Sequence, residues 1–228
     1  MPEEDEWFAD TGYRAAVVDL LGALAYGELS AFIRLAADAE LAPRLAAKGA
    51  LARLAAVEFG HYELICERLT MLGADPNEAM APFVAAVDAF HERTAPSDWL
   101  EGLVKFYVGD GIAMDFYREV SAFLDPQTRD LVTKALADMG RSEFVVAEVR
   151  GALEVEPVQA GRLALWGRRL VGEALSQAQR VVADRDAFST LLVGSGAFPG
   201  TGLAEVVQMF GRITEAHTQR MSQLGLAA

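Results

Sequence analysis

The sequence predicts an all-α protein, and three observations support this fold class. Apolar residues recur at intervals of three and four through long stretches, as on one face of an α-helix. No segment shows the alternation of apolar and polar residues that is typical of a half-buried β-strand. Most of the 8 prolines fall between the apolar stretches, where they separate one helix from the next. The chain has 228 residues, 52% of them hydrophobic, and is long enough to bury the core of one domain.

The first half of the chain predicts two long helices and a broken connector. The expected elements are a helix from Thr11 to about Ala42, a second from Pro43 to Leu72, and a connector from Asn77 to Thr94. Pro43 is placed at the first helical position, where its missing N–H costs nothing. Gly73 and Asp75-Pro76 end the second helix. The connector is expected to break near Pro82 and to cross the end of a bundle.

The second half predicts four more helices. They are expected from Ser97 to Phe123, from Pro126 to about Glu154, from about Ala160 to Val193, and from Leu203 to Leu224. Ser97 is a suitable N-cap for the first of these, and Asp125 for the second. Residues 194–202, with four glycines and Pro199, predict a loop. Alternating short and long connections indicate an antiparallel four-helix bundle. We expect a single domain over residues 1–228, with the bundle at about 11–154 and additional helices at about 157–224.

Composition argues against several kinds of partner and site, although a local basic patch stays open. The net charge of −13 opposes non-specific binding to nucleic acid or to an anionic membrane. The lone cysteine, Cys66, excludes an internal disulfide framework and any site built from several cysteines. The acidic stretch Met1 to Asp10 has no basic region and no long apolar run, unlike a secretory signal. No apolar stretch is expected to reach the length of about 20 residues that spans a bilayer. We therefore expect a soluble, cytoplasmic protein.

The motif Glu58-Phe59-Gly60-His61 places a carboxylate and an imidazole on one side of the second helix, since residues three apart differ by about 60° in azimuth. One such pair is common on solvated surfaces. An internal repeat strengthens the interpretation of this motif as part of a site, because Tyr26-Gly27-Glu28 resembles Tyr107-Val108-Gly109-Asp110. The motif itself resembles Asp138-Met139-Gly140-Arg141.

The turns place these carboxylates at matching heights. Glu28 precedes Pro43 by 15 residues, and Glu58 follows it by 15. Asp110 precedes Leu124 by 14 residues, and Asp138 follows it by 14. At about 1.5 Å per residue, the two members of each pair are level in their helical hairpin. Four carboxylates on four helices are therefore expected in one layer. Their burial is costly unless a positive group lies among them.

In this pattern the chain resembles the ferritin-like superfamily, in which one Glu on each of two helices and a Glu-x-x-His on each of two others hold two metals. Within it, the chain is most similar to the bacterial ferritin-like proteins related to the tRNA isopentenyl-adenosine hydroxylases (MiaE-like). The resemblance covers roughly Ala15 to Val193. It implies a two-iron site that activates dioxygen and hydroxylates the isopentenyl side chain of a modified adenosine in tRNA.

The resemblance assigns metal ligands to six positions. They are Glu28, Glu58 and His61 in the first half, and Asp110, Asp138 and Arg141 in the second. Arginine has five donors and no lone pair and cannot bind a metal. Arg141 instead replaces the expected second histidine, and its charge is expected to fill the second metal position beside Asp138 and Asp110 or Glu58.

Three occupancies remain open at this stage: two irons, one divalent metal on Glu28, Glu58 and His61, or a metal-free charge network. Two functions follow from them. One is an iron-dependent hydroxylase or related oxidoreductase that acts on tRNA or on a small apolar substrate. The other is a non-catalytic ferritin-like protein whose carboxylate layer supports structure or self-association, for example as a homodimer.

Four further expectations concern the surroundings. His91 is expected to be solvated and to lie near a helix end. Glu63 is expected on the surface. Asp115 and Glu119 form an alternative ligand pair if the helical register differs by a turn. A cavity lined by Phe59, Phe106 or Met114 would favour a substrate.

Overall fold

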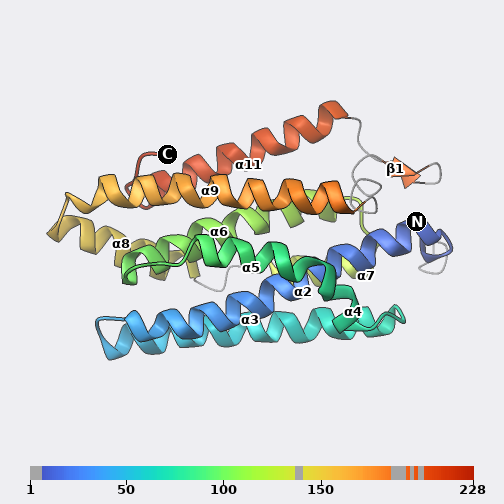
Figure 1. Ribbon diagram of the computed structural model, residues 1–228, viewed down its shortest axis with the longest axis horizontal. Helices are drawn as coiled ribbons and strands as arrows, with labels where there is room; N and C mark the ends of the chain where they lie inside the picture. Colours follow the sequence, from blue (N-terminus) through green and yellow to red (C-terminus); the bar gives the residue numbers. More distant parts are fainter. Residues whose placement is uncertain (1–6, 137–140, 186–193, 196–197, 200–202) are drawn as a thin grey trace.

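The chain is all-α, as the sequence predicts, and its helices form a bundle with two short strands at one end (Figure 1). The computed structural model describes residues 7–136, 141–185, 194–195, 198–199 and 203–228, with the backbone alone at 141–142, 182–183, 194–195, 198–199 and 203–204. The α-helices are α2 (Thr11–Asp38), α3 (Leu45–Met71), α4 (Pro76–Met80), α5 (Val84–Arg93), α6 (Trp99–Ser121), α7 (Pro126–Ala135), α8 (Arg141–Val155), α9 (Gln159–Asp184) and α11 (Leu203–Gln223).

Helices α2 and α3 form the first hairpin and pack along most of their length (Figure 1). Asp10 caps α2, since its side chain accepts hydrogen bonds from the backbone amides of Gly12 and Tyr13. The short 3-10 helix η1 (Ala39–Leu41) follows α2. Helix α3 begins at Leu45 with Arg44 as its N-cap, so Pro43 lies before the helix and not at its first position.

The connector is broken at Pro82, as predicted, by the 3-10 helix η2 (Ala81–Phe83) between α4 and α5. It does not cross the end of the bundle. Helix α5 packs against α9 and α2 along the side instead (Figure 1). Helix α4 approaches α2 very closely, because a Cβ atom at Gly22 would lie 2.2 Å from the carbonyl oxygen of Ala79. This crossing requires glycine.

In the second half, two helix boundaries differ from the prediction. The N-cap of α6 is Asp98, while Ser97 donates hydrogen bonds to Glu101 from its backbone amide and its hydroxyl. The predicted fourth helix is two helices, because α7 ends at Ala135 and α8 starts at Arg141. Leu136 is the C-cap of α7, with φ of −88° and ψ of 4°, and residues 137–140 lie outside the described residues. Asp125 caps α7, as predicted, by accepting from the amide of Thr128.

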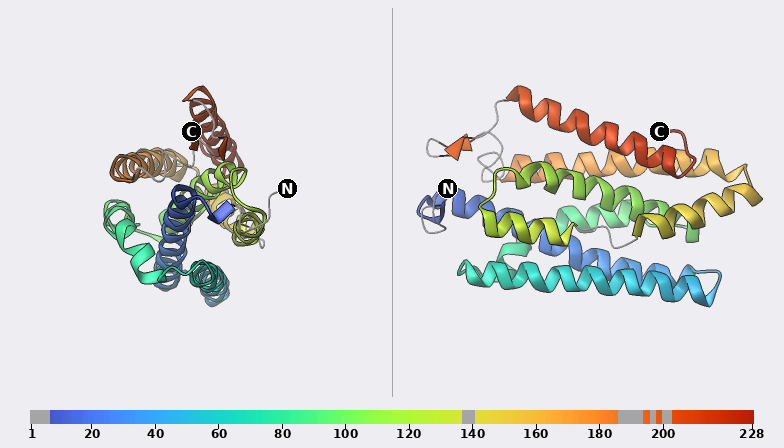
Figure 2. Two further views of the ribbon diagram at one scale, coloured as in Figure 1. Left: turned by 90° about the vertical axis from the view of Figure 1, so that its right-hand side faces the viewer. Right: turned by 180° about the vertical axis from the view of Figure 1, so that it is seen from behind.

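The end of α9 and the loop after it also differ from the prediction. Helix α9 ends at Asp184, nine residues before the predicted Val193, and Arg185 is extended with φ of −133°. The side chain of Arg185 pairs with the buried Asp19 of α2 and fixes this end of the helix. Strands β1 (Gly194–Ser195) and β2 (Phe198–Pro199) then pair antiparallel within the predicted loop. Helix α11 packs on α6, at the opposite edge of the molecule from α3 (Figure 2).

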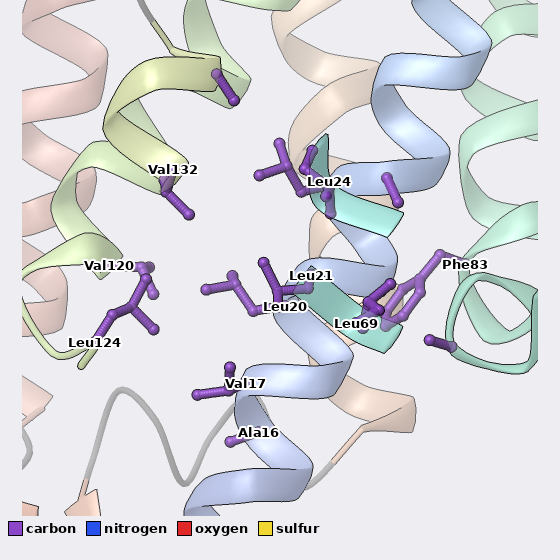
Figure 3. Packing of buried hydrophobic residues seen from close by; sticks show 14 of the residues in the cluster. Ala16, Val17, Leu20, Leu21, Leu24, Leu69, Phe83, Val120, Leu124 and Val132 are labelled. Carbon is purple, nitrogen blue, oxygen red and sulfur yellow. The ribbon is translucent and has the colours of Figure 1, made fainter. Parts of the chain in front are cut away.

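The buried apolar residues form two clusters, one toward each end of the bundle. One cluster includes Leu20, Leu21, Leu69, Phe83 and Leu124 (Figure 3). The other includes Leu35, Leu51, Leu103, Val149 and Leu170. Between them lies a buried polar layer, at Glu28 in α2 and at Glu58 and His61 in α3. The apolar clusters therefore hold the layer in place from both sides.

The segment Thr11–Leu41 is long and apolar enough to cross a membrane, with a mean hydropathy of 1.6 over its best 18-residue window, although the sequence analysis expected no such stretch. In the structure, 56% of that window is buried inside the molecule. The segment includes α2, whose partners are α3, α4 and α6. Its apolar character is therefore that of a core helix that contacts protein on several sides.

Candidate metal site

Glu28, Glu58 and His61 meet in the buried layer. Their side chains come from facing positions of α2 and α3, because the hairpin places residues 28 and 58 at the same height. The relative exposures are 7% for Glu28, 0% for Glu58 and 8% for His61. One oxygen of each carboxylate and one imidazole nitrogen lie within 4.8 Å of one another. This compact set of two oxygens and one nitrogen is a candidate metal site.

The contacts within the cluster are longer than hydrogen bonds. His61 Nδ1 lies 3.5 Å from Glu28 Oε2 and 3.5 Å from Glu58 Oε2, whereas N–H···O bonds span about 2.7–3.2 Å. In the part of the chain that the structure describes, Glu28 Oε2 and His61 Nδ1 make no hydrogen bond. Buried polar atoms are normally satisfied, so these two unsatisfied atoms are candidate metal ligands.

Burial and mutual repulsion control the electrostatics of the layer. Burial raises the pKa of Glu28 well above its ordinary value, and Glu58 and Asp110 raise it further, while His61 opposes the change. Burial alone would lower the pKa of His61, but Glu28 and Glu58 raise it to about 9. Without a metal, the layer therefore retains protons at neutral pH. A bound divalent cation would replace them.

Helix α6 adds Asp110 and Tyr117 to the surroundings of Glu28. Asp110 is half-buried and close enough to raise the pKa of Glu28, but it lies outside the group of atoms within 4.8 Å. Burial and the charge of Glu28 raise the pKa of Tyr117. The sequence analysis did not identify Tyr117. Its spacing of seven residues from Asp110, which gives the same helix face, is the signal that could have found it.

The second-half positions Asp138 and Arg141 are only partly visible. Asp138 and the side chain of Arg141 lie outside the described residues, although Arg141 is the first residue of α8. Their predicted place in the layer therefore stays a prediction. The structure itself brings together Glu28, Glu58 and His61, with Asp110 nearby.

The alternative ligand pair on α6 has other partners. Asp115 accepts from Arg220 of α11 at 2.6 Å and from Arg118 at 2.8 Å. Glu119 accepts a bidentate contact from Arg212, at 2.9 and 2.7 Å. These ion pairs attach α11 to α6, so the pair has a structural role.

One cavity formed by described residues is not lined by the aromatic and apolar residues named for the layer. That cavity, of about 270 Å³, is lined by Pro43, Arg44, Trp99, Leu100, Ala147, Glu148, Gly151 and Ala152. Arg44 and Glu148 lie on its wall and form an ion pair at 2.5 Å. Its lining residue Arg44 follows Glu28 of the layer by 16 residues in the chain. Phe59, Phe106 and Met114 are not among the lining residues. This cavity is therefore not the one beside the layer whose presence would favour a substrate.

A helical bundle with carboxylates and a histidine in a buried layer is the architecture of ferritin-like proteins. The comparison with protein families agrees with this class, since the model described as a ferritin-like domain of actinomycetes matches residues 11–195. The chain belongs to this ferritin-like family. No curated protein matches the chain. The finer resemblance to tRNA hydroxylases stays a prediction.

Proposed function

We propose that the protein is an iron-dependent, oxygen-activating oxidoreductase of the ferritin-like class, with one divalent metal held by Glu28, Glu58 and His61. The observation that carries this proposal is the buried cluster of two carboxylates and one imidazole with donor atoms within 4.8 Å. The spacing of 3.5 Å from His61 Nδ1 to both carboxylates supports a shared cation, because it is too long for hydrogen bonds.

The chemistry of the donor set fits iron. Two carboxylates and a neutral histidine balance the charge of one divalent cation, and oxygen and imidazole ligands suit Fe(II). The metal would supply one-electron redox chemistry toward dioxygen. Glu28 and Glu58 would bind it and neutralise its charge, and His61 would bind after losing its proton. The apolar clusters flank the layer on both sides, and the three site residues are at most 8% exposed.

We infer that the substrate is a small apolar molecule in preference to tRNA. The net charge of −13 opposes the approach of a polyanion, and the layer lies between apolar clusters. We further propose a cytoplasmic location. A homodimer through α9 and α11 is the proposed assembly, because Leu165 and Val207 are each 65% exposed there. Light scattering after size-exclusion chromatography tests this assembly.

A second candidate is a non-catalytic protein in which the layer is a metal-free charge network. The raised pKa of His61, about 9, supports it, because a protonated His61 lies between two carboxylates. In this case Arg141 would supply the second positive charge. The two candidates differ in one measurable property, which is metal affinity.

The test compares two glutamate-to-glutamine variants on α3, one at the site and one on the surface. After treatment with EDTA, the wild-type protein should bind Fe(II) under anaerobic conditions, as measured by calorimetry, and its melting temperature should rise. At a metal concentration of 100 Kd the stabilisation is about 2.7 kcal/mol, or roughly 5–10 °C for a chain of this size. Glu58→Gln should lose this rise. Glu63→Gln should retain it, because Glu63 is exposed on the same helix.

Arg141→His then tests the second metal position. If Arg141 occupies it, the histidine variant should bind two metals per chain where the wild type binds one. If neither protein binds Fe(II), the metal-free network is the correct reading. Retention of Fe(II) binding in Glu58→Gln at the level of Glu63→Gln would show that the metal binds elsewhere.

A further inference from the structure

A second group of polar residues, which includes the buried Lys105 and the buried Nδ1 atom of His91, lies where α2, α5 and α6 meet. This Lys105 cluster consists of Arg34 and Asp38 of α2, Phe90 and His91 of α5, and Lys105 of α6. Asp38 is ten residues beyond Glu28 on α2, which places it about 15 Å further along the helix. The proposed metal chemistry does not use this cluster.

Lys105 is buried without a counter-ion. Only 6% of it is exposed, and no carboxylate of the described residues lies within 4 Å of its Nζ. Its contact is the ring of Phe90, whose centroid lies 5.7 Å from Nζ. By contrast, Lys48 pairs with Glu40 at 2.9 Å on the surface. A cation–π contact only partly offsets the loss of hydration of a largely buried ammonium, and Lys105 makes no side-chain hydrogen bond to the described residues.

His91 also has a polar atom that no described residue satisfies. Its Nδ1 atom is buried and makes no hydrogen bond in the described part of the chain, although the sequence analysis expected His91 to be solvated. Burial lowers the pKa of His91 to about 3, and the charges of Lys105 and Arg34 contribute. The ring is therefore neutral and can offer an N–H from Nδ1.

The charges around Lys105 have a positive excess. Arg34 and Lys105 are cationic, and Asp38 is the one carboxylate whose charge acts on Lys105. Asp38 packs against Gly102, one turn before Lys105, with Oδ2 at 3.5 Å from the position of a Gly102 Cβ. Burial raises the pKa of Asp38, and Lys105 and Arg34 oppose this change. Two cations and one carboxylate leave a net charge of +1, which one monoanion would balance.

We propose that the Lys105 cluster binds a small organic carboxylate between Lys105, Arg34 and Nδ1 of His91, with its carbon atoms against Phe90. Arg34 is exposed, so the cluster is open to solvent on that side. Three features select this ligand class: the net charge matches a monoanion, the donors match carboxylate oxygens, and the ring of Phe90 offers an apolar surface. An inorganic phosphate carries more charge and has no apolar part.

The experiment uses the full chain at pH 7 with sodium acetate, sodium benzoate, sodium phosphate and sodium chloride at equal ionic strength. Melting temperature and calorimetry measure binding. Acetate and benzoate should bind saturably, with benzoate tighter because of Phe90. Lys105→Met should weaken benzoate binding by at least about 10-fold, the loss of one charge-assisted hydrogen bond. Lys48→Met is the matched control and should bind as the wild type does.

Asp38→Asn gives a test of sign. If the cluster binds an anion, removing the competing carboxylate of Asp38 should tighten benzoate binding. If Asp38 is the true partner of Lys105 through a water molecule, the same change should give no tightening, and the proposal fails. The chain has three lysines, so an NMR spectrum of protein labelled with ¹³C-lysine can follow each of them. Addition of benzoate should change the Cε chemical shift of Lys105 alone.

Three other results would overturn the proposal. One is the absence of saturable carboxylate binding, and another is equal binding in Lys105→Met and the wild type. The third is binding of phosphate or chloride without binding of acetate or benzoate, which would identify a general anion contact.

Discussion

Replacing Lys105 with methionine should stabilise the protein at pH 7, although the change removes a charged residue. Burial lowers the pKa of Lys105 from 10.5 to about 8, with Arg34 contributing and Asp38 opposing. This fall corresponds to about 3 kcal/mol, at about 1.36 kcal/mol for each pH unit. Partial solvent screening reduces the expected gain to about 1–3 kcal/mol. Methionine has a similar length and pays no cost of charge burial.

The pH dependence of the same variant has a defined sign. Between pH 8 and 10.5 the unfolded chain holds a proton on Lys105 that the folded chain has released, so wild-type stability rises with pH there. The advantage of Lys105→Met should therefore shrink as the pH rises through this window. Urea unfolding at pH 7, 8, 9 and 10, without added carboxylate, measures both quantities.

Lys48→Met serves as the control for this prediction. It removes a surface ion pair with Glu40 and should change stability by less than about 1 kcal/mol at every pH. The reasoning is refuted if Lys105→Met destabilises the protein at pH 7, or if its advantage is independent of pH. Either result would mean that the folded protein stabilises the charged form of Lys105 by contacts other than an ion pair.

Two further predictions concern the packing that supports the layer. Gly22→Ala should destabilise the protein by about 2–4 kcal/mol in urea unfolding, because its Cβ would lie 2.2 Å from a backbone oxygen of Ala79. Gly161→Ala is its control, since its Cβ meets nothing within 4 Å, and it should be neutral or stabilising. Arg68→Met should cost about 3–5 kcal/mol, because it removes the 3.1 Å ion pair of the fully buried Asp125. A loss below about 1 kcal/mol in thermal or urea unfolding would show that other contacts of Asp125 suffice.

The sequence predicts the long helices well, because their apolar residues repeat with the period of a helix. It also predicts the meeting of Glu28 with Glu58 and His61, because equal distances from one short turn leave the hairpin little freedom. The predicted helix boundaries are wrong where a local side-chain contact competes with the predicted cap or helix end. Asp98 replaces Ser97 as the N-cap because Ser97 bonds to Glu101 instead. Helix α9 ends early, where Arg185 leaves the helical conformation and pairs with Asp19.

The second half of the candidate site was less predictable for a physical reason. The equal-height argument for Asp110 and Asp138 assumed one continuous helix after Asp125, and that helix is interrupted after Ala135. The Lys105 cluster escaped the sequence analysis because its members come from three helices. The visible signal was a lysine inside the apolar run from Leu103 to Val108.

The metal content of the purified protein, loaded anaerobically with Fe(II) and then desalted, tests the central claim most directly. Elemental analysis should give about one iron per chain for the wild type and for Glu63→Gln. It should give none for Glu58→Gln or His61→Ala, because the three buried donors act together. Iron that remains at the wild-type level in both ligand variants, or its absence from the wild type, would contradict the assignment of Glu28, Glu58 and His61 as a metal site.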